Sequence, residues 1–403
     1  MVGAAFCYIT AHSKLAATYK DNSPVNAPLP ENLIDQLLAS VRQEDIPAAK
    51  AIRYVDQVLT TFRKIGLSTQ DAQYTLVVLV NIAESYEVLS SLEKATEVYL
   101  EALAMARSQN DRAREADILW KIGRVFRKRN RWKEALSYLE ESKHHNEAES
   151  PGLAWCWINE GLIKSSQGHY DEATEAFNYG LEIGEKLQDD RIVAATAMNM
   201  GISHTIQGDF DRAILLFNSC LSVYEQVDKP TQIAFAFHNM GMCLMANQNY
   251  PNAIDAFEKS LEIAQEKGDL ILTALNYVHK AAVYLEFNDR TLVASYCARA
   301  LDTFKEVDYP LGIAETYKVL GRLYTQKEDW TTAQGLLAES LRLCQQYEKP
   351  LGIAEVQREI GKLHMAQNET DLARVTLEAA RDQFETLGAR HDVLVTNELL
   401  SAL

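Results

Sequence analysis

The sequence predicts an all-α fold, a right-handed solenoid of antiparallel helix pairs. Two observations predict it. A small residue recurs at intervals of about 40 residues over most of the chain, and polar turns and prolines divide the chain into pieces of helix length. No segment longer than a few residues alternates apolar and polar residues as a strand would.

The recurring small residue sets the register of each repeat. It stands at Ala83, Gly123, Gly161, Gly201, Gly241, Ala281, Gly321 and Gly361. A second small residue follows each of these positions, and it is alanine everywhere except at Val293. Four residues further on comes a bulkier side chain, such as Tyr99, Phe217 or Leu337. Two closely packed helices need small side chains where their axes approach and large ones beside them, so each repeat is expected to form two helices joined by a short turn.

The prolines agree with these helix boundaries. Five of them fall near expected helix starts, where a missing N–H costs little: Pro151, Pro230, Pro251, Pro310 and Pro350. None falls in the middle of an expected helix, where proline would break the hydrogen-bond ladder. The proline positions therefore support the same division into helices.

On these residues the chain resembles a tetratricopeptide repeat (TPR) protein over residues 72–388. Residues 200–214 and 240–254 carry the family's small, aromatic and alanine positions, and so do residues 320–324 with Trp330 and Ala333. The family's unit has about 34 residues. A 40-residue unit implies longer helices, as in kinesin light chain, Pins-type polarity adaptors and bacterial regulatory TPR arrays. The resemblance implies a TPR superhelix that binds other proteins.

The flanks differ in composition from the repeats. Residues 1–30 are expected to hold a short helix and a proline-rich linker, and residues 31–66 a degenerate helix pair broken near Pro47. Residues 67–390 are then eight TPR units, and residues 391–403 are a helix that caps the last unit.

Composition and charge exclude several classes of function. Lys+Arg is 40 against Asp+Glu 56, so a net charge of −16 leaves no basic field for general nucleic-acid binding. The sequence has no apolar run of membrane-spanning length and no signal-peptide pattern, so we expect a cytoplasmic protein that does not insert into membranes. The six scattered cysteines are expected to be reduced and buried.

The sequence carries no motif for catalysis. It lacks the nucleotide-binding, metalloprotease and serine-hydrolase patterns. The pair His144 and His145 is interpreted as part of a solvated turn rather than a metal site. We therefore expect a protein that is not an enzyme and needs no cofactor or metal.

The binding site is expected on the concave face, which the first helices line in such a stack. Asparagine recurs two residues before the small residue, from Asn81 onward. A row of amides offers donors and acceptors to the backbone of an extended peptide. The resemblance to long-unit TPR families that bind such peptides implies this role for Asn159, Asn199 and Asn239. The alternative is that these amides tie adjacent helices together.

Side chains near the central asparagines would add contacts with a peptide. Trp155 and Phe235 are candidate anchors, Met242 and Met245 can adapt to a ligand, and His238 lies beside them. The alternative for each is packing against a neighbouring helix.

Both ends of the expected groove carry cations. One helix face presents Lys121, Arg124, Arg127 and Lys128, and Lys318 and Arg322 stand near the other end. These cations would attract an acidic segment of a partner. The alternative is local pairing with Asp117, Glu315, Glu355 and Glu359.

Three functions are compatible with these features. The leading hypothesis is a protein-interaction scaffold or adaptor that holds an extended peptide segment of a partner, with an acidic segment as one option. The second is a regulator gated by a ligand or signalling peptide, similar to Rap-type bacterial regulators, with residues 1–66 as an effector region. The third is a structural subunit of a large assembly, because residues 120–126 and the shortened unit after them resemble a TPR subunit of the axonemal dynein docking complex.

Overall fold

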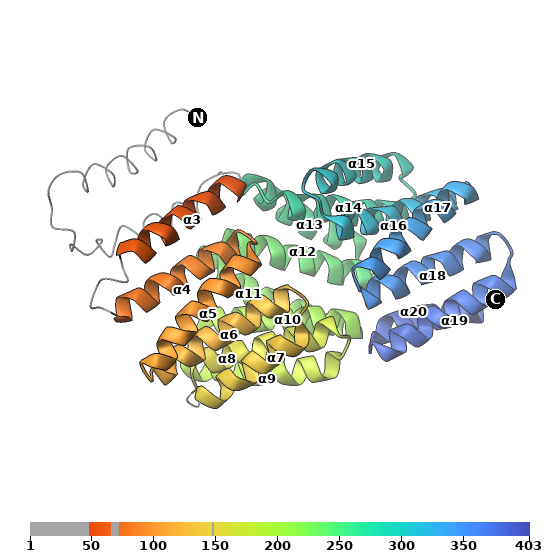
Figure 1. The fold of residues 1–403 in the computed structure, drawn as a ribbon. Helices are drawn as coiled ribbons and strands as arrows, with labels where there is room; N and C mark the ends of the chain where they lie inside the picture. Colours follow the sequence, from red (N-terminus) through yellow and green to blue (C-terminus); the bar gives the residue numbers. More distant parts are fainter. Residues whose placement is uncertain (1–47, 66–71, 147–148) are drawn as a thin grey trace. The chain divides into compact units, whose positions relative to one another are not determined.

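The computed structural model describes residues 48–65, 72–146 and 149–403. These residues form eighteen helices and no strand, which confirms the predicted all-α class (Figure 1). Within this described part, no helix is both long and apolar enough to cross a membrane. The helix and linker predicted for residues 1–30, and most of the pair predicted for residues 31–66, lie outside the described residues.

The chain divides into two compact units, Met1–Asn146 (the N-terminal unit) and Glu147–Leu403 (the C-terminal unit). The described helices of the N-terminal unit are α3 (Ala48–Ile65), α4 (Ala72–Val88), α5 (Leu92–Ser108), α6 (Arg112–Lys128) and α7 (Trp132–His145). Those of the C-terminal unit are α8 (Pro151–Ser166), α9 (Tyr170–Leu187), α10 (Asp190–Gln207), α11 (Phe210–Gln226), α12 (Pro230–Ala246), α13 (Tyr250–Glu266), α14 (Leu270–Glu286), α15 (Arg290–Glu306), α16 (Pro310–Gln326), α17 (Trp330–Gln346), α18 (Pro350–Ala366), α19 (Thr370–Thr386) and α20 (Arg390–Ser401).

Each even-numbered helix from α4 to α18 is the first helix of a pair and packs most extensively on the helix that follows it. The contact is made where the recurring glycine meets a large side chain of the second helix. A Cβ atom added to Gly161 would lie 2.5 Å from the ring of Phe177, and one added to Gly241 would lie 2.6 Å from the ring of Phe257. Glycine is therefore needed at these positions for close approach of the helices, as the sequence predicts.

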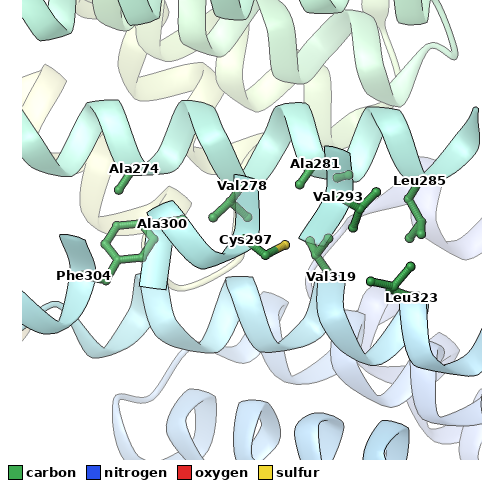
Figure 2. Close-up of a cluster of buried hydrophobic side chains, with 11 residues drawn as sticks. Ala274, Val278, Ala281, Leu285, Val293, Cys297, Ala300, Phe304, Val319 and Leu323 are labelled. Carbon is green, nitrogen blue, oxygen red and sulfur yellow. The ribbon is translucent and has the colours of Figure 1, made fainter. Parts of the chain in front are cut away.

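The repeat around Ala281 differs from its neighbours and shows the same constraint. Here the small residue is alanine, and the residue opposite is Cys297 instead of phenylalanine or leucine. Both are fully buried in a cluster shared by α14, α15 and α16, which Figure 2 shows together with Val278, Phe304 and Val319. The larger first residue is accommodated because the second is smaller, so the volume at the contact is kept.

Local signals place the helix ends. Pro151, Pro230, Pro310 and Pro350 are the first residues of their helices, where no intrahelical N–H bond is lost. Aspartates cap several other helices. The carboxylate of Asp269, for example, accepts a hydrogen bond of 2.9 Å from the backbone N–H of Leu272.

The first helices form the inner side of the C-terminal unit. Successive first helices from α8 to α18 contact one another, whereas successive second helices of the described chain make no comparable contacts. In a curved stack, the helices nearer the axis of curvature are the ones that meet. Residues that face along this row are therefore placed together by the fold.

We predict that Gly241→Ala destabilises the protein by about 1–3 kcal/mol, because the new methyl group overlaps the ring of Phe257. In a Phe257→Cys background the same substitution is expected to stabilise, because it restores the alanine–cysteine pairing found at Ala281 and Cys297. Urea unfolding of the four variants measures this reversal of sign.

Gly335→Ala is the matched control, since a Cβ atom there meets nothing within 4 Å. It should stabilise by about 1 kcal/mol through helix propensity alone. Equal effects of Gly241→Ala in both backgrounds would contradict the packing explanation.

Candidate functional site

The position two residues before the small residue faces the preceding first helix. The rings of His279 on α14 and His238 on α12 lie 5.0 Å apart. Oε2 of Glu359 on α18 lies 3.5 Å from Nε of Arg322 on α16. The predicted asparagine row therefore runs along the contacts between successive first helices.

Asn159, the first asparagine of this row in the C-terminal unit, is buried with 2% of its surface exposed. Its side-chain Nδ2 donates a hydrogen bond of 2.8 Å to the backbone oxygen of Trp155. Trp155 is half-buried and packs against the cluster around Ile158 and Phe177. This placement fits the alternative in which the amide supports the helices.

Asn199 and Asn239 occupy the same position on α10 and α12 but are only half-buried. Nδ2 of Asn199 donates a hydrogen bond of 2.8 Å to the backbone oxygen of Ala195, and the side chain makes no other hydrogen bond with the described chain. Asn239 makes none with any residue whose placement is described. Two neighbouring amides thus keep donors and acceptors that the fold does not use.

Apolar side chains surround these two amides. Phe235 is 38% exposed, and Met242 and Met245 are half-buried against the cluster that contains Leu244 and Phe257. Helix α12 carries no Asp, Glu, Lys or Arg. The stretch of the inner face formed by Asn199, Phe235, Asn239, Met242 and Met245, called the α10–α12 face below, is uncharged and partly accessible.

The predicted site residue His238 belongs to a buried polar network instead of the accessible face. Its Nδ1 lies 2.9 Å from Oδ1 of Asn276, whose amide donates 2.9 Å to Oγ of Ser260. His279 stacks beside it, and its buried Nδ1 has no hydrogen-bond partner in the described structure. Burial lowers the pKa of His238, and burial with the charges of His238 and Lys318 lowers the pKa of His279 well below its usual range.

Carboxylates of α16 itself and of the neighbouring first helices neutralise the cations Lys318 and Arg322. Lys318 pairs with Glu315 at 2.9 Å and with Glu355 on α18. Arg322 pairs with Glu286 on α14 and contacts Glu359. These are the local partners that the sequence offered as the alternative, together with Glu286.

Glu359 is the most enclosed carboxylate of this ion-pair network. Burial by itself raises its pKa, but Lys362, Arg322 and Arg358 outweigh burial and lower the pKa to about 2. The carboxylate is therefore ionised at neutral pH and holds the cations around it in place.

In the N-terminal unit, the cations of α6 pair with carboxylates of α4. Lys121 contacts Glu84 and Asp117, both at 2.9 Å, and Arg124 and Lys128 contact Glu87 at 2.7 and 2.8 Å. Burial and the charge of Arg124 lower the pKa of Arg127 to about 10. Asn81 is half-buried on α4.

One group in the N-terminal unit has the composition of a metal site. Ligand atoms of Glu115, Glu141 and His145 all lie within 4.8 Å of one another. Arg107 donates to both carboxylates, at 2.8 Å to Glu115. The guanidinium already supplies the positive charge that these carboxylates need, so the group is accounted for as an ion-pair network.

Sequence reasoning missed the buried histidine network and the ion pairs to Glu84, Glu87 and Glu286. Each joins residues on different repeats, whose contacts depend on how the repeats stack. The available signal was that an amide, Asn276, stands at a position where the equivalent residues are Thr196, Ala236, Thr316 and Val356.

Comparison with known proteins assigns the repeats. Models of the tetratricopeptide repeat match residues 74–143 and 232–306, residues 316–351 and residues 193–227. Together these matches cover more than half of the chain. No curated protein sequence matches it.

Several solved structures share the fold at low sequence identity. A Rap protein complexed with competence and sporulation factor has a TM-score of 0.56 at 13% identity, over 93% of this chain and 98% of that chain. Aspartyl phosphate phosphatase F from Bacillus subtilis has a TM-score of 0.59 at 12% identity, over 90% of this chain and 97% of that chain. The apo form of the quorum sensor NprR from B. thuringiensis has a TM-score of 0.57 at 14% identity, over 87% of this chain and 97% of that chain.

We predict that the buried histidines make the protein less stable in mild acid. Below the ordinary histidine pKa of 6.5 the unfolded chain binds protons that buried His238 and His279 do not, so the free energy of unfolding falls as the pH falls. The loss should be absent above the ordinary histidine pKa and should grow below it, until each folded-state pKa is reached.

Urea unfolding at about pH 7.5 and pH 5.5 measures this loss for the wild type and for His238→Gln/His279→Gln. The double variant should lose less stability on acidification than the wild type. An identical loss in both proteins would show that other groups cause it.

Proposed function

We propose that this chain, which belongs to the tetratricopeptide repeat family, is a non-catalytic interaction protein that binds an extended segment of a partner protein on the α10–α12 face. The observation that carries the proposal is the pair of half-buried amides, Asn199 and Asn239, with unused donors and acceptors. Burying an amide without partners costs free energy, so such groups suit a surface that receives a hydrogen-bonding ligand.

The spacing of the two amides suits an extended backbone. Adjacent packed helices lie about 8–10 Å apart, and an extended chain advances about 3.3 Å per residue. Asn199 and Asn239 would therefore meet backbone groups about three residues apart. A segment lying across α10 and α12 in this way would be held through its main chain, with little dependence on its sequence.

The surrounding side chains define what the segment carries at its centre. Phe235, Met242 and Met245 offer apolar contacts, and methionine adapts to different shapes. An unpaired charge buried here would be costly, so the central residues of the segment are uncharged. Acidic residues of a partner would have to compete with Glu355 and Glu359 for Lys318 and Arg322.

Two further observations support a non-catalytic role. TPR repeats generally serve as scaffolds, and the described thiols are unsuited to nucleophilic chemistry. Burial raises the pKa of Cys220 and of Cys297 to about 12, so neither is a thiolate at neutral pH.

A second candidate function is a regulator switched by a signalling factor. The Rap protein that shares this fold was solved with competence and sporulation factor, and NprR is a quorum sensor. Such a factor would occupy the same α10–α12 face. Small-angle scattering distinguishes the two, because a regulator changes its compactness on binding and a scaffold does not.

We predict that Asn199→Ala/Asn239→Ala weakens the binding of peptides selected from a randomised eight-residue library by about tenfold or more, since each lost hydrogen bond is worth about 0.5–1.5 kcal/mol. Fluorescence anisotropy measures the dissociation constants. Asn218→Ala, at an exposed position on the second helix α11, is the matched control and should leave them unchanged.

The thermal midpoints of all three proteins should agree closely, which separates loss of contact from loss of fold. Equal affinities for the wild type and the double variant would refute the proposed face.

A further inference from the structure

The row of first helices in the C-terminal unit returns on itself. Contacts run from α10 through α12, α14 and α16 to α18, an ion pair between Arg358 and Asp392 links α18 to α20, and α20 contacts α10. Helix α20 and the turn before it thus lie against residues more than 180 positions earlier in the chain (Figure 1). We call the contact of residues 387–393 with residues 168–171 and 206–210 the seam.

The seam combines apolar, aromatic and charged contacts. The ring of His391 packs edge-to-face on Phe210 at 5.0 Å. Ile206 packs against a buried cluster that includes Phe384 and Ala389. The guanidinium of Arg390 pairs with Asp171 at 3.2 Å.

Two residues of the seam, Leu387 and Ala389, are more buried than their equivalents in other repeats. Leu387 is 5% exposed, whereas Val227 and Tyr347 at the same position of other turns are each 38% exposed. Ala389 is fully buried, whereas its equivalents Lys229 and Lys349 are exposed. The last turn therefore has the composition of an interface, unlike the turns that face solvent.

Glycines mark the opposite side of the seam. The turn inside each repeat holds one residue with positive φ, and this residue is Gln248, Asn288, Glu328 or Asn368 in the repeats away from the seam. A positive φ alone therefore does not demand glycine; φ is 56–61° at these four residues and 83–85° at the two glycines of the seam. At the seam the residue is Gly168 or Gly208, and an added Cβ atom would lie 2.3 Å from Cδ2 of Leu387 or 3.1 Å from Cβ of His391. The close approach of the last turn and the larger φ both favour glycine at these two positions.

We propose that the seam is a gate that must open before a partner segment held at both ends can reach the α10–α12 face. This inference rests on the proposed function. The first helices face inward, and the seam closes their row into a ring, so a segment that continues into folded protein on both sides has no way in while the ring is closed. Helix α10 couples the two sites, because it carries Asn199 at its centre and the seam residue Ile206 in its last turn, and Gly208 caps its C-terminus.

A disulfide across the seam tests the gate on one protein in two states. A Cβ atom at position 208 would lie 3.1 Å from Cβ of His391, a few tenths of an ångström short of the disulfide range. A small shift of the last turn therefore allows a cysteine pair, Gly208→Cys/His391→Cys, in a Cys7→Ser background. The five described native cysteines are buried and do not compete. The oxidised protein has its seam locked, and the reduced protein does not.

The probe is the randomised eight-residue library in two formats, one with a free end and one as a loop between two folded domains. Locking the seam should slow the association of loop-format binders by about tenfold or more, within the range of typical couplings between sites, and leave free-ended binders nearly unaffected. Reduction should restore the loop-format rate.

A pair of substitutions tests the opposite change. Gly168→Asn keeps a residue that tolerates positive φ but pushes against Leu387, so it should speed loop-format association by about tenfold. Gly268→Asn, at a positive-φ glycine outside the seam, is the matched control and should change nothing.

The outcomes separate the gate from the proposed function. Equal loop-format rates in the oxidised and reduced proteins, or failure of the cysteine pair to cross-link, overturn the gate while leaving the binding face in place. If neither library format yields a binder to the reduced protein, the proposed function itself fails.

Discussion

The close approach of two helices at one small residue is the constraint on which the structure depends. The repeats of the C-terminal unit keep the volume at this point, either as glycine against phenylalanine or leucine, or as Ala281 against Cys297. The first repeat departs from this rule, with Ala83 and Tyr99 at these positions. This contact sets the distance within each pair, and with the short turns it sets how one pair stacks on the next. The row of first helices, and therefore every site on it, follows from that spacing.

The inner row has two halves of different chemistry. From α14 to α20, ion pairs join neighbouring first helices, as between Lys318 and Glu355 or Arg358 and Asp392. Their cations are occupied, and their carboxylates repel an acidic ligand. From α10 to α12 the row has no such pairs, and Asn199 and Asn239 keep unused hydrogen-bonding groups. The difference favours the uncharged half as the binding face and the charged half as its support.

The repeat register and the helix boundaries could be predicted from the sequence because both are local or periodic. A small residue every 40 positions and proline at helix starts act within one repeat. The candidate site was only partly predictable. Asn159 and Asn199 look alike in the sequence, yet one is buried and the other is not. Their difference depends on the neighbouring helices, and so do the pairing of Arg322 with Glu286 and the burial of His238.

In a repeat protein the equivalent positions serve as internal controls, so a departure from the pattern carries information. Cysteine replaces phenylalanine at position 297 because the residue opposite, Ala281, is larger than the usual glycine. Positions 168 and 208 hold glycine at a φ of 83–85°, whereas other repeats hold glutamine, asparagine or glutamate at 56–61°, and both glycines lie against a close neighbour from the last turn. That neighbour is the turn before α20. The 40-residue period does not predict this contact, because the period sets the spacing of the repeats along the chain and not the curvature of the row. The positions that depart from the repeat pattern therefore indicate where the curved row of first helices meets itself.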